Sequence, residues 1–148
     1  MNNDPINIER VFNAPISKVW KAITERDEMA KWYFDLAEFK PETGFQFRFS
    51  GGPSPERQYL HLCEITEVID KRKLSYTWRY DGYRGNTLVT FELLEHEDNF
   101  TLLKLTHVGI ETFPEENPDF AKSNFVEGWN EIIHVSLKKH LETSDFQF

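Results

Sequence analysis

The strongest constraint on the fold lies near the C-terminal end of the chain. Large apolar side chains recur there at every fourth position, namely Phe125, Trp129, Ile133, Leu137 and Leu141. This spacing predicts one amphipathic helix over 118–142, because residues four apart lie on the same helical face. Asn117 is a favourable N-cap and Pro118 a favourable first helical residue.

The predicted helix needs a surface to pack against. Burial of its five large side chains contributes on the order of 10 kcal/mol. Ordering the backbone of about 25 residues costs at least that much. Its opposite face is polar, with Glu127, Glu131 and Lys138. The rest of the chain must therefore supply an apolar surface for one side of this helix.

Most of the remaining chain alternates apolar and polar residues, the period of half-buried strands. The predicted strands cover 6–12, 45–49, 58–69, 74–79, 89–93 and 102–107. Two short helices are expected between the first two strands, one from Pro15 and one over 28–33. The Gly- and Pro-containing stretch 50–55 is expected to be a flexible loop, and 95–99 a hairpin tip.

This order of elements predicts an α+β fold in which about six to seven antiparallel strands pack on the long helix. The length of 148 residues is that of one domain, expected over 1–148.

Composition limits the classes of function. The net charge is −8 and no basic run occurs, which argues against nucleic acid and anionic membranes as partners. No apolar run approaches the roughly 20 residues of a membrane span. One cysteine permits no internal disulfide, and the N-terminus has no signal-peptide pattern. We therefore expect a cytoplasmic protein without membrane insertion.

Aromatic residues make up 15% of the chain, including 13 Phe and 4 Trp, more rings than a small core needs. The side chains expected between sheet and helix form a candidate ligand-cavity set: Trp32, Phe45, Phe47, Phe49, Tyr59, His61, Tyr76, Trp78, Phe91, Leu105, His107, Phe125, Trp129 and Ile133. Such faces usually pack together as core. A dry, empty cavity of about 300 Å³ would cost about 7 kcal/mol, so any cavity should be small, wet or occupied.

Two histidines, His61 and His107, are the polar groups expected to point inward. Each can be a structural residue bonded to a hydroxyl or carbonyl, a group that orients a ligand, or a catalytic base. No carboxylate or nucleophile shares their face, so no catalytic residue is assigned. His134 and His140 lie six apart and do not form a helical metal pair. No metal or cofactor is expected.

Several segments, taken in order, resemble one family. They are 12–20 (Phe-Asn-Ala-Pro-Ile-Ser-Lys-Val-Trp), 30–32 (Ala-Lys-Trp), 41–45 (Pro-Glu-Thr-Gly-Phe), 74–78 (Leu-Ser-Tyr-Thr-Trp), 89–93 (Val-Thr-Phe-Glu-Leu), 101–107 (Thr-Leu-Leu-Lys-Leu-Thr-His) and 128–129 (Gly-Trp). The chain is similar to homologues of the activator of the heat-shock-protein-90 ATPase, within the START-like or SRPBCC superfamily.

The resemblance implies a Bet v 1-like helix-grip fold with a cavity for an apolar or amphipathic small molecule between sheet and helix. Two departures matter. The pattern often has a glycine pair near Gly44 and a glycine where Cys63 stands. The chain also has no room for the separate N-terminal domain of the eukaryotic activator, and this weakens the transfer of the co-chaperone role to this chain.

Three functions remain open at this point. The first is a non-enzymatic protein that binds an apolar or amphipathic small molecule. The second is a stress-linked interaction protein that stimulates a chaperone ATPase through an exposed face. The third is a cyclase or hydrolase acting in the same cavity, with His61 or His107 as base.

Overall fold

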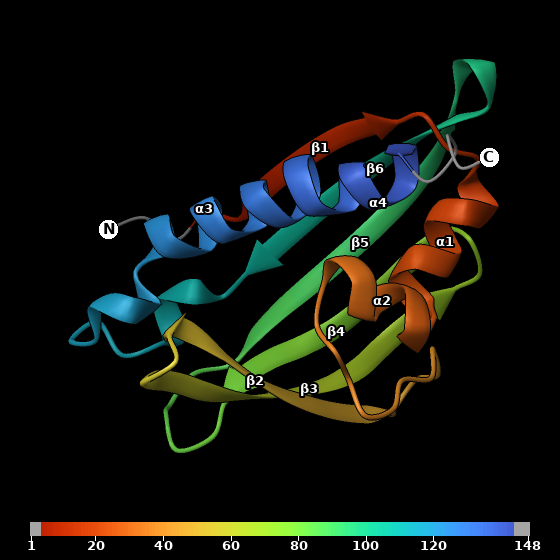
Figure 1. Ribbon diagram of the computed structural model, residues 1–148. Helices are drawn as coiled ribbons and strands as arrows, with labels where there is room; N and C mark the ends of the chain where they lie inside the picture. The colour runs from red at the N-terminus through yellow and green to blue at the C-terminus, as the bar shows by residue number, and fades with distance from the viewer. Residues whose placement is uncertain (1–3, 144–148) are drawn as a thin grey trace.

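A computed structural model of the chain describes residues 4–143. Six strands form one curved antiparallel sheet in the order β1-β6-β5-β4-β3-β2, and the C-terminal helix lies along its concave side (Figure 1). This arrangement confirms the predicted α+β helix-grip fold, at the lower end of the expected number of strands.

The helices and strands are as follows: β1 (Ile6–Phe12), α1 (Ile16–Thr24), α2 (Arg26–Trp32), β2 (Gln46–Ser54), β3 (Arg57–Ile69), β4 (Lys73–Tyr80), β5 (Thr87–His96), β6 (Phe100–Val108), α3 (Lys122–Glu131), the π-helical segment η4 (Ile132–Leu137) and α4 (Lys138–Thr143). Short 3₁₀ turns cover Glu97–Asn99 (η1), Ile110–Thr112 (η2) and Pro118–Phe120 (η3). None of the helices in the described part of the chain is long and apolar enough to cross a membrane.

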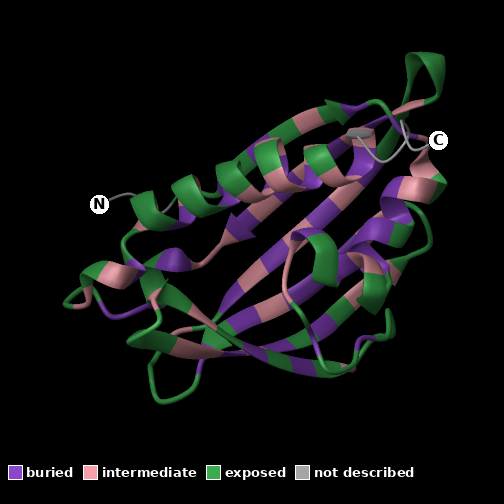
Figure 2. Cartoon of the chain, viewed as in Figure 1, coloured by how far each residue is buried: buried purple, intermediate pink, exposed green. Residues whose placement is uncertain are grey.

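The sheet buries alternate residues of each strand, as the period of two predicts. In β6, Thr101, Leu103, Leu105 and His107 are buried while their neighbours are half-buried. Their cross-strand partners on β5 follow the same parity, with Phe91 opposite Leu105 and Val89 opposite His107. Figure 2 shows this alternation as buried residues separated by half-buried or exposed ones along the strands. One face of the sheet is therefore core and the other faces solvent.

The long helix begins later than predicted. Asn117 does act as a cap, since its side-chain oxygen accepts from the Asp119 backbone N–H at 2.9 Å. The cap serves the η3 turn, however, and Ala121 is extended (φ −65°, ψ 142°) before α3 starts at Lys122. The prediction of one helix from Pro118 was wrong here, because Phe120 turns inward and is buried at this corner.

The π-helical segment η4 explains how residues four apart stay on one face. In a regular α-helix, four residues turn about 40° beyond a full turn, so a four-residue stripe drifts around the helix. A π-helical segment has i to i+5 bonding and a wider turn, which offsets that drift. Ile133 and Leu137 of η4 and Leu141 of α4 are all fully buried. The stripe predicted from sequence is confirmed, and η4 keeps its second half against the sheet.

The stretch 50–55 is not the flexible loop that was predicted. Strand β2 continues to Ser54, β3 starts at Arg57, and Ser54 pairs with Arg57 across a tight turn. The pairing shifts register between Gly51 and Ser54. Glycine permits the irregularity: a Cβ at Gly52 would lie 1.8 Å from the Arg57 carbonyl oxygen. Gly52 thus marks a close backbone approach inside a hairpin.

Alanine at Gly52 is therefore expected to destabilise the fold by about 1–3 kcal/mol, since backbone must move to admit the Cβ. Alanine at Gly51 is the matched control. Its Cβ would meet only side-chain atoms, the Cε1 atoms of His61 at 3.4 Å and of Phe34 at 3.5 Å. Urea denaturation of both variants checks this difference, and equal losses of stability would contradict it.

The two short helices close one end of the sheet. Helix α2 begins at Arg26 rather than near Glu28, because the Glu25 carbonyl accepts from the Met29 N–H at 2.9 Å. The Trp32 indole donates to the Ala22 carbonyl at 2.8 Å and joins α2 to α1. Both helices pack beside the second half of the C-terminal helix (Figure 1). The other end of the sheet, beside α3, is left uncovered by them.

Candidate ligand-binding site

The space between sheet and helix is filled with side chains in its deeper part. The Tyr76 ring packs edge-on against Phe47 at 5.1 Å, and Phe91 packs edge-on against Trp129 at 6.0 Å. The Tyr33 and Tyr76 hydroxyls are 2.6 Å apart and bond to each other. Burial raises the pKa of both tyrosines, so the pair is neutral.

An open pocket of about 560 Å³ lies at the end of the sheet beside α3. It is open to solvent and most of its exposed lining is apolar. Its lining comes from the Tyr33–Phe34 segment, the β2–β3 hairpin, β4, η3, α3 and the start of η4: Phe34, Gly51, Gly52, Pro53, Arg57, Tyr59, His61, Trp78, Tyr80, Asp119, Phe120, Asn124, Phe125, Gly128, Trp129 and Ile132.

Two indoles and a histidine form the inner wall of this pocket. Trp78 lies 5.6 Å from Trp129 and 4.9 Å from His61, centroid to centroid. His61 stacks on Phe49 at 4.4 Å. The Trp78 indole donates to the Tyr80 hydroxyl at 2.9 Å. The wall is therefore a set of packed rings, and the indole nitrogen of Trp78 is already hydrogen-bonded.

His107 lies behind this wall, and both of its ring nitrogens are hydrogen-bonded. The Trp129 indole donates to Nδ1 at 3.0 Å, so the neutral ring carries its proton on Nε2. Nε2 donates to the Thr87 hydroxyl at 2.8 Å, which donates to the Trp78 carbonyl at 2.7 Å. Burial lowers the pKa of His107 to about 3. The residue joins three strands and the helix, and does not line the pocket.

His61 faces the pocket and is also neutral. Its Nδ1 lies 3.0 Å from the Tyr59 carbonyl, which accepts, so Nδ1 carries the proton and Nε2 is an acceptor. Burial lowers its pKa to about 4, although the carbonyls of Tyr59 and Phe49 oppose the shift. At neutral pH His61 therefore offers a hydrogen-bond acceptor and carries no charge.

A polar cluster borders the mouth of the pocket and joins the β2–β3 hairpin to η3. The Arg57 guanidinium donates twice to the Asp119 carboxylate, at 2.8 and 3.1 Å. The Tyr59 hydroxyl donates to the same carboxylate at 2.6 Å. The hydrogen bond from Arg57 lowers the pKa of Asp119 most, and the hydrogen bond from Tyr59 lowers it further. The pocket thus has an apolar interior and a charged, hydrogen-bonded rim.

The structure divides the predicted cavity residues into two groups. Those that line the open pocket are Tyr59, His61, Trp78, Phe125 and Trp129. Those that lie outside its lining are Trp32, Phe45, Phe47, Phe49, Tyr76, Phe91, Leu105, His107 and Ile133. Phe45 is half-buried against the core and the other eight of this second group are buried.

Sequence reasoning missed the lining residues that strand alternation and the helical stripe do not reach. Phe34 lies in a loop, Asp119 and Phe120 lie in η3, and Gly51 and Gly52 were assigned to a loop. The clearest available signal was the Gly-Gly pair, which marks a place where backbone or ligand comes close.

The comparisons with known proteins concern the family and the fold. The profile of the family described as "Activator of Hsp90 ATPase homolog 1-like protein" matches residues 13–142. The chain belongs to this family. No match was found among curated proteins.

Several solved structures share the fold of this family member. Protein MLL2253 from Mesorhizobium loti is 24% identical with a TM-score of 0.76, over 97% of this chain and 100% of that one. Protein CV1439 from Chromobacterium violaceum is 20% identical with a TM-score of 0.76, over 96% and 99%. CalU16 from Micromonospora echinospora is 22% identical with a TM-score of 0.71, over 95% and 78%. Identities in this range show the fold alone.

Proposed function

We propose that this protein binds an apolar or amphipathic small molecule in the open pocket between α3 and the β2–β4 side of the sheet. The observation that carries the proposal is a ring-lined pocket of about 560 Å³ with a charged rim. That volume falls in the range of small-molecule sites, and an apolar interior with a few polar groups is their usual composition. Ligand binding is also common in the superfamily to which this family belongs.

The lining fits a flat apolar body. Trp78, Trp129 and Phe34 offer ring faces or edges, and rings pair favourably in offset or edge-on arrangements. Burial of apolar ligand surface would contribute about 25 cal/mol per Å². The neutral His61 would accept one hydrogen bond from the bound molecule, which gives orientation without burying a charge.

The rim fits a polar end group. Arg57 is 60% exposed at its side chain, whereas Asp119 is 14% exposed, so the guanidinium keeps free donors toward solvent. A ligand with one polar or anionic end could lie with its apolar body inside and that end beside Arg57. An amphipathic ligand therefore satisfies both parts of the site.

Native mass spectrometry of protein purified from its own host tests the proposal. We expect a bound species of a few hundred daltons that is released on unfolding and has an apolar ring system or chain. Protein that carries no small molecule, and whose indole spectra respond to no apolar compound in a screen, would overturn the proposal.

Activation of a chaperone ATPase stays a prediction, supported by the family description alone. It is tested by chaperone ATP turnover at saturating concentrations of this protein. An unchanged turnover would remove it, and this outcome is independent of whether the pocket binds a ligand.

A further inference from the structure

The outer face of the sheet is organised in bands that cross the strands. One band pairs charges of opposite sign, with Glu9 opposite Lys104 and Lys104 opposite Glu92. Another consists of hydroxyl groups, in which Ser75 donates to Thr90 at 3.0 Å. In these bands each side chain lies opposite a residue of complementary charge or hydrogen-bonding type.

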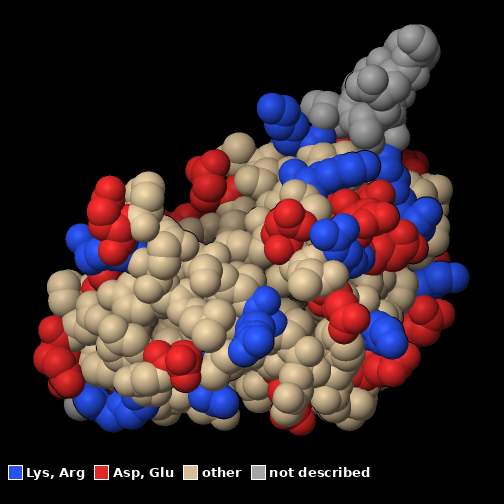
Figure 3. All heavy atoms as spheres, turned by 60° about the horizontal axis from the view of Figure 1, so that its bottom comes forward, with Lys and Arg blue, Asp and Glu red and all other residues tan. Residues whose placement is uncertain are grey.

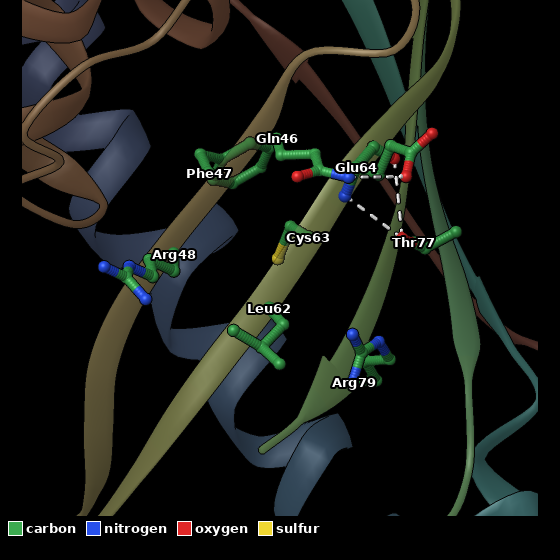
Figure 4. Close-up of a pocket in the computed structure, with 8 residues that line it drawn as sticks. All are labelled: Gln46, Phe47, Arg48, Leu62, Cys63, Glu64, Thr77 and Arg79. Atoms are coloured by element: carbon green, nitrogen blue, oxygen red, sulfur yellow. Dashed lines mark hydrogen bonds between the residues drawn. The ribbon is translucent and has the colours of Figure 1, made fainter.

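A different band crosses β2, β3 and β4. Leu62 of β3 pairs with Arg48 of β2 on one side and with Arg79 of β4 on the other. Figure 4 shows the three side chains beside a shallow hollow of about 340 Å³, with the two guanidinium groups on either side of the leucine. Both arginines are exposed and Leu62 is half-buried. Two cations thus lie on either side of an accessible apolar side chain.

These two arginines differ from the others in the chain. Arg26, Arg57, Arg72 and Arg84 each have a carboxylate within ion-pair distance, and Arg10 bonds to His134 at 3.1 Å. Within residues 4–143, Arg48 and Arg79 have no ion pair or side-chain hydrogen bond. In a protein of net charge −8, these two arginines lie on either side of a single strand.

Glu64, which lines the same hollow, does not neutralise them. Glu64 accepts from the Gln46 side-chain nitrogen at 3.3 Å, and its backbone N–H donates to the Thr77 hydroxyl at 3.1 Å. Its carboxylate lies more than 4 Å from both guanidinium groups, since it forms no ion pair with either. The positive charge of Arg48 and Arg79 is therefore available to an external group.

We propose that the Arg48–Leu62–Arg79 band docks an acidic amphipathic helix of a protein partner. Strands are spaced about 4.8 Å apart, so the two arginines lie about 10 Å apart across β3. On a helix, residues seven apart lie on one face and about 10.5 Å apart. A helix with carboxylates at positions i and i+7 and an apolar residue at i+4 therefore matches cation, leucine and cation in spacing and charge.

Broad polyanions fit this surface less well. Figure 3 shows acidic side chains near most of the basic ones on the side of the molecule that it draws, so an extended anionic surface there would also meet carboxylates. Nucleic acid and anionic membranes gain affinity from several clustered cations. Two arginines around one leucine favour a partner with two placed carboxylates and an apolar side chain between them.

The test uses a blocked helical peptide of about 15 residues with two glutamates seven positions apart and a leucine between them. Titration into the full chain is followed by NMR of the arginine Nε–Hε groups and the Leu62 methyl groups. We expect shifts confined to this band with a dissociation constant of about 1 mM or tighter. The variant Arg48→Glu/Arg79→Glu should weaken binding at least about tenfold, through loss of two ion pairs and new repulsion.

Lys31→Glu/Lys40→Glu is the matched control, since it changes the net charge equally at two exposed residues outside the band. It should leave the affinity within about twofold. A peptide with lysine in place of both glutamates should not bind. The proposal is overturned if the acidic peptide causes no shifts at about 1 mM, if both double variants bind it equally, or if phosphatidylserine vesicles or inorganic phosphate shift the band while the peptide does not.

Discussion

The substitution Gly128→Leu is expected to weaken binding of an apolar probe in the pocket strongly while the fold is kept. Gly128 lines the pocket from α3, and a Cβ at this position would meet nothing within 4 Å. A leucine side chain would therefore extend into the space that the ligand needs. The backbone is already helical, so glycine to leucine should stabilise α3 by about 0.5–1 kcal/mol.

The measurement is fluorescence titration with 1-anilinonaphthalene-8-sulfonate, which has an apolar ring system and one anionic group. We expect saturable binding by the unmodified chain and at least about a 30-fold loss of affinity in Gly128→Leu. Asn130→Leu is the matched control, because Asn130 is exposed on the same helix and does not line the pocket. Equal binding by both variants would show that the probe binds elsewhere.

Acidification from pH 7 to pH 5 is expected to lower the free energy of unfolding by about 4 kcal/mol through two buried histidines. The folded-state pKa of His61 is lowered to about 4 and that of His107 to about 3, in both cases because burial disfavours the charged ring. In the unfolded chain both titrate near 6.5.

The sign follows from which state binds more protons. Below about pH 6.5 the unfolded chain takes up protons that the folded chain does not. The free energy of unfolding therefore decreases as the pH is lowered, until the pH reaches the folded-state pKa values. Each histidine contributes about 1.4 kcal/mol per pH unit, or about 2 kcal/mol by pH 5.

Urea denaturation at several pH values measures this dependence. His61→Phe keeps a ring against Phe49 but cannot titrate, so its loss of stability between pH 7 and pH 5 should be about half as large. His96→Gln is the control, because it removes a histidine that is exposed at the end of β5 and not buried. A pH dependence that stays the same in His61→Phe would contradict the role assigned to its burial.

The sheet and the buried stripe of the helix were accessible from sequence because each follows a simple period. Alternation placed Phe91, Leu105 and His107 on the inner face, where they are buried. The four-residue spacing from Phe125 to Leu141 placed those side chains against the sheet. Both patterns reflect burial on one face, which residue type reports directly.

The hairpin and the pocket were not accessible in the same way. Ser50 to Pro55 has the composition of a loop, but Gly52 approaches the Arg57 carbonyl inside a continuous hairpin. The η4 segment follows from tertiary packing and has no local signature. Deep ring positions such as Phe47 and Tyr76 share the parity of the pocket residues, so alternation alone could not separate core from binding surface.

The indole N–H signals test the central claim most directly, because the four tryptophans include two in the pocket wall and two outside it. Trp78 and Trp129 line the pocket, whereas Trp20 and Trp32 belong to α1 and α2. On titration with 1-anilinonaphthalene-8-sulfonate, we expect the Trp78 and Trp129 signals to shift with one saturation curve while those of Trp20 and Trp32 stay in place. Shifts at Trp20 or Trp32 without shifts at Trp78 and Trp129 would contradict the assignment of this pocket as the ligand site.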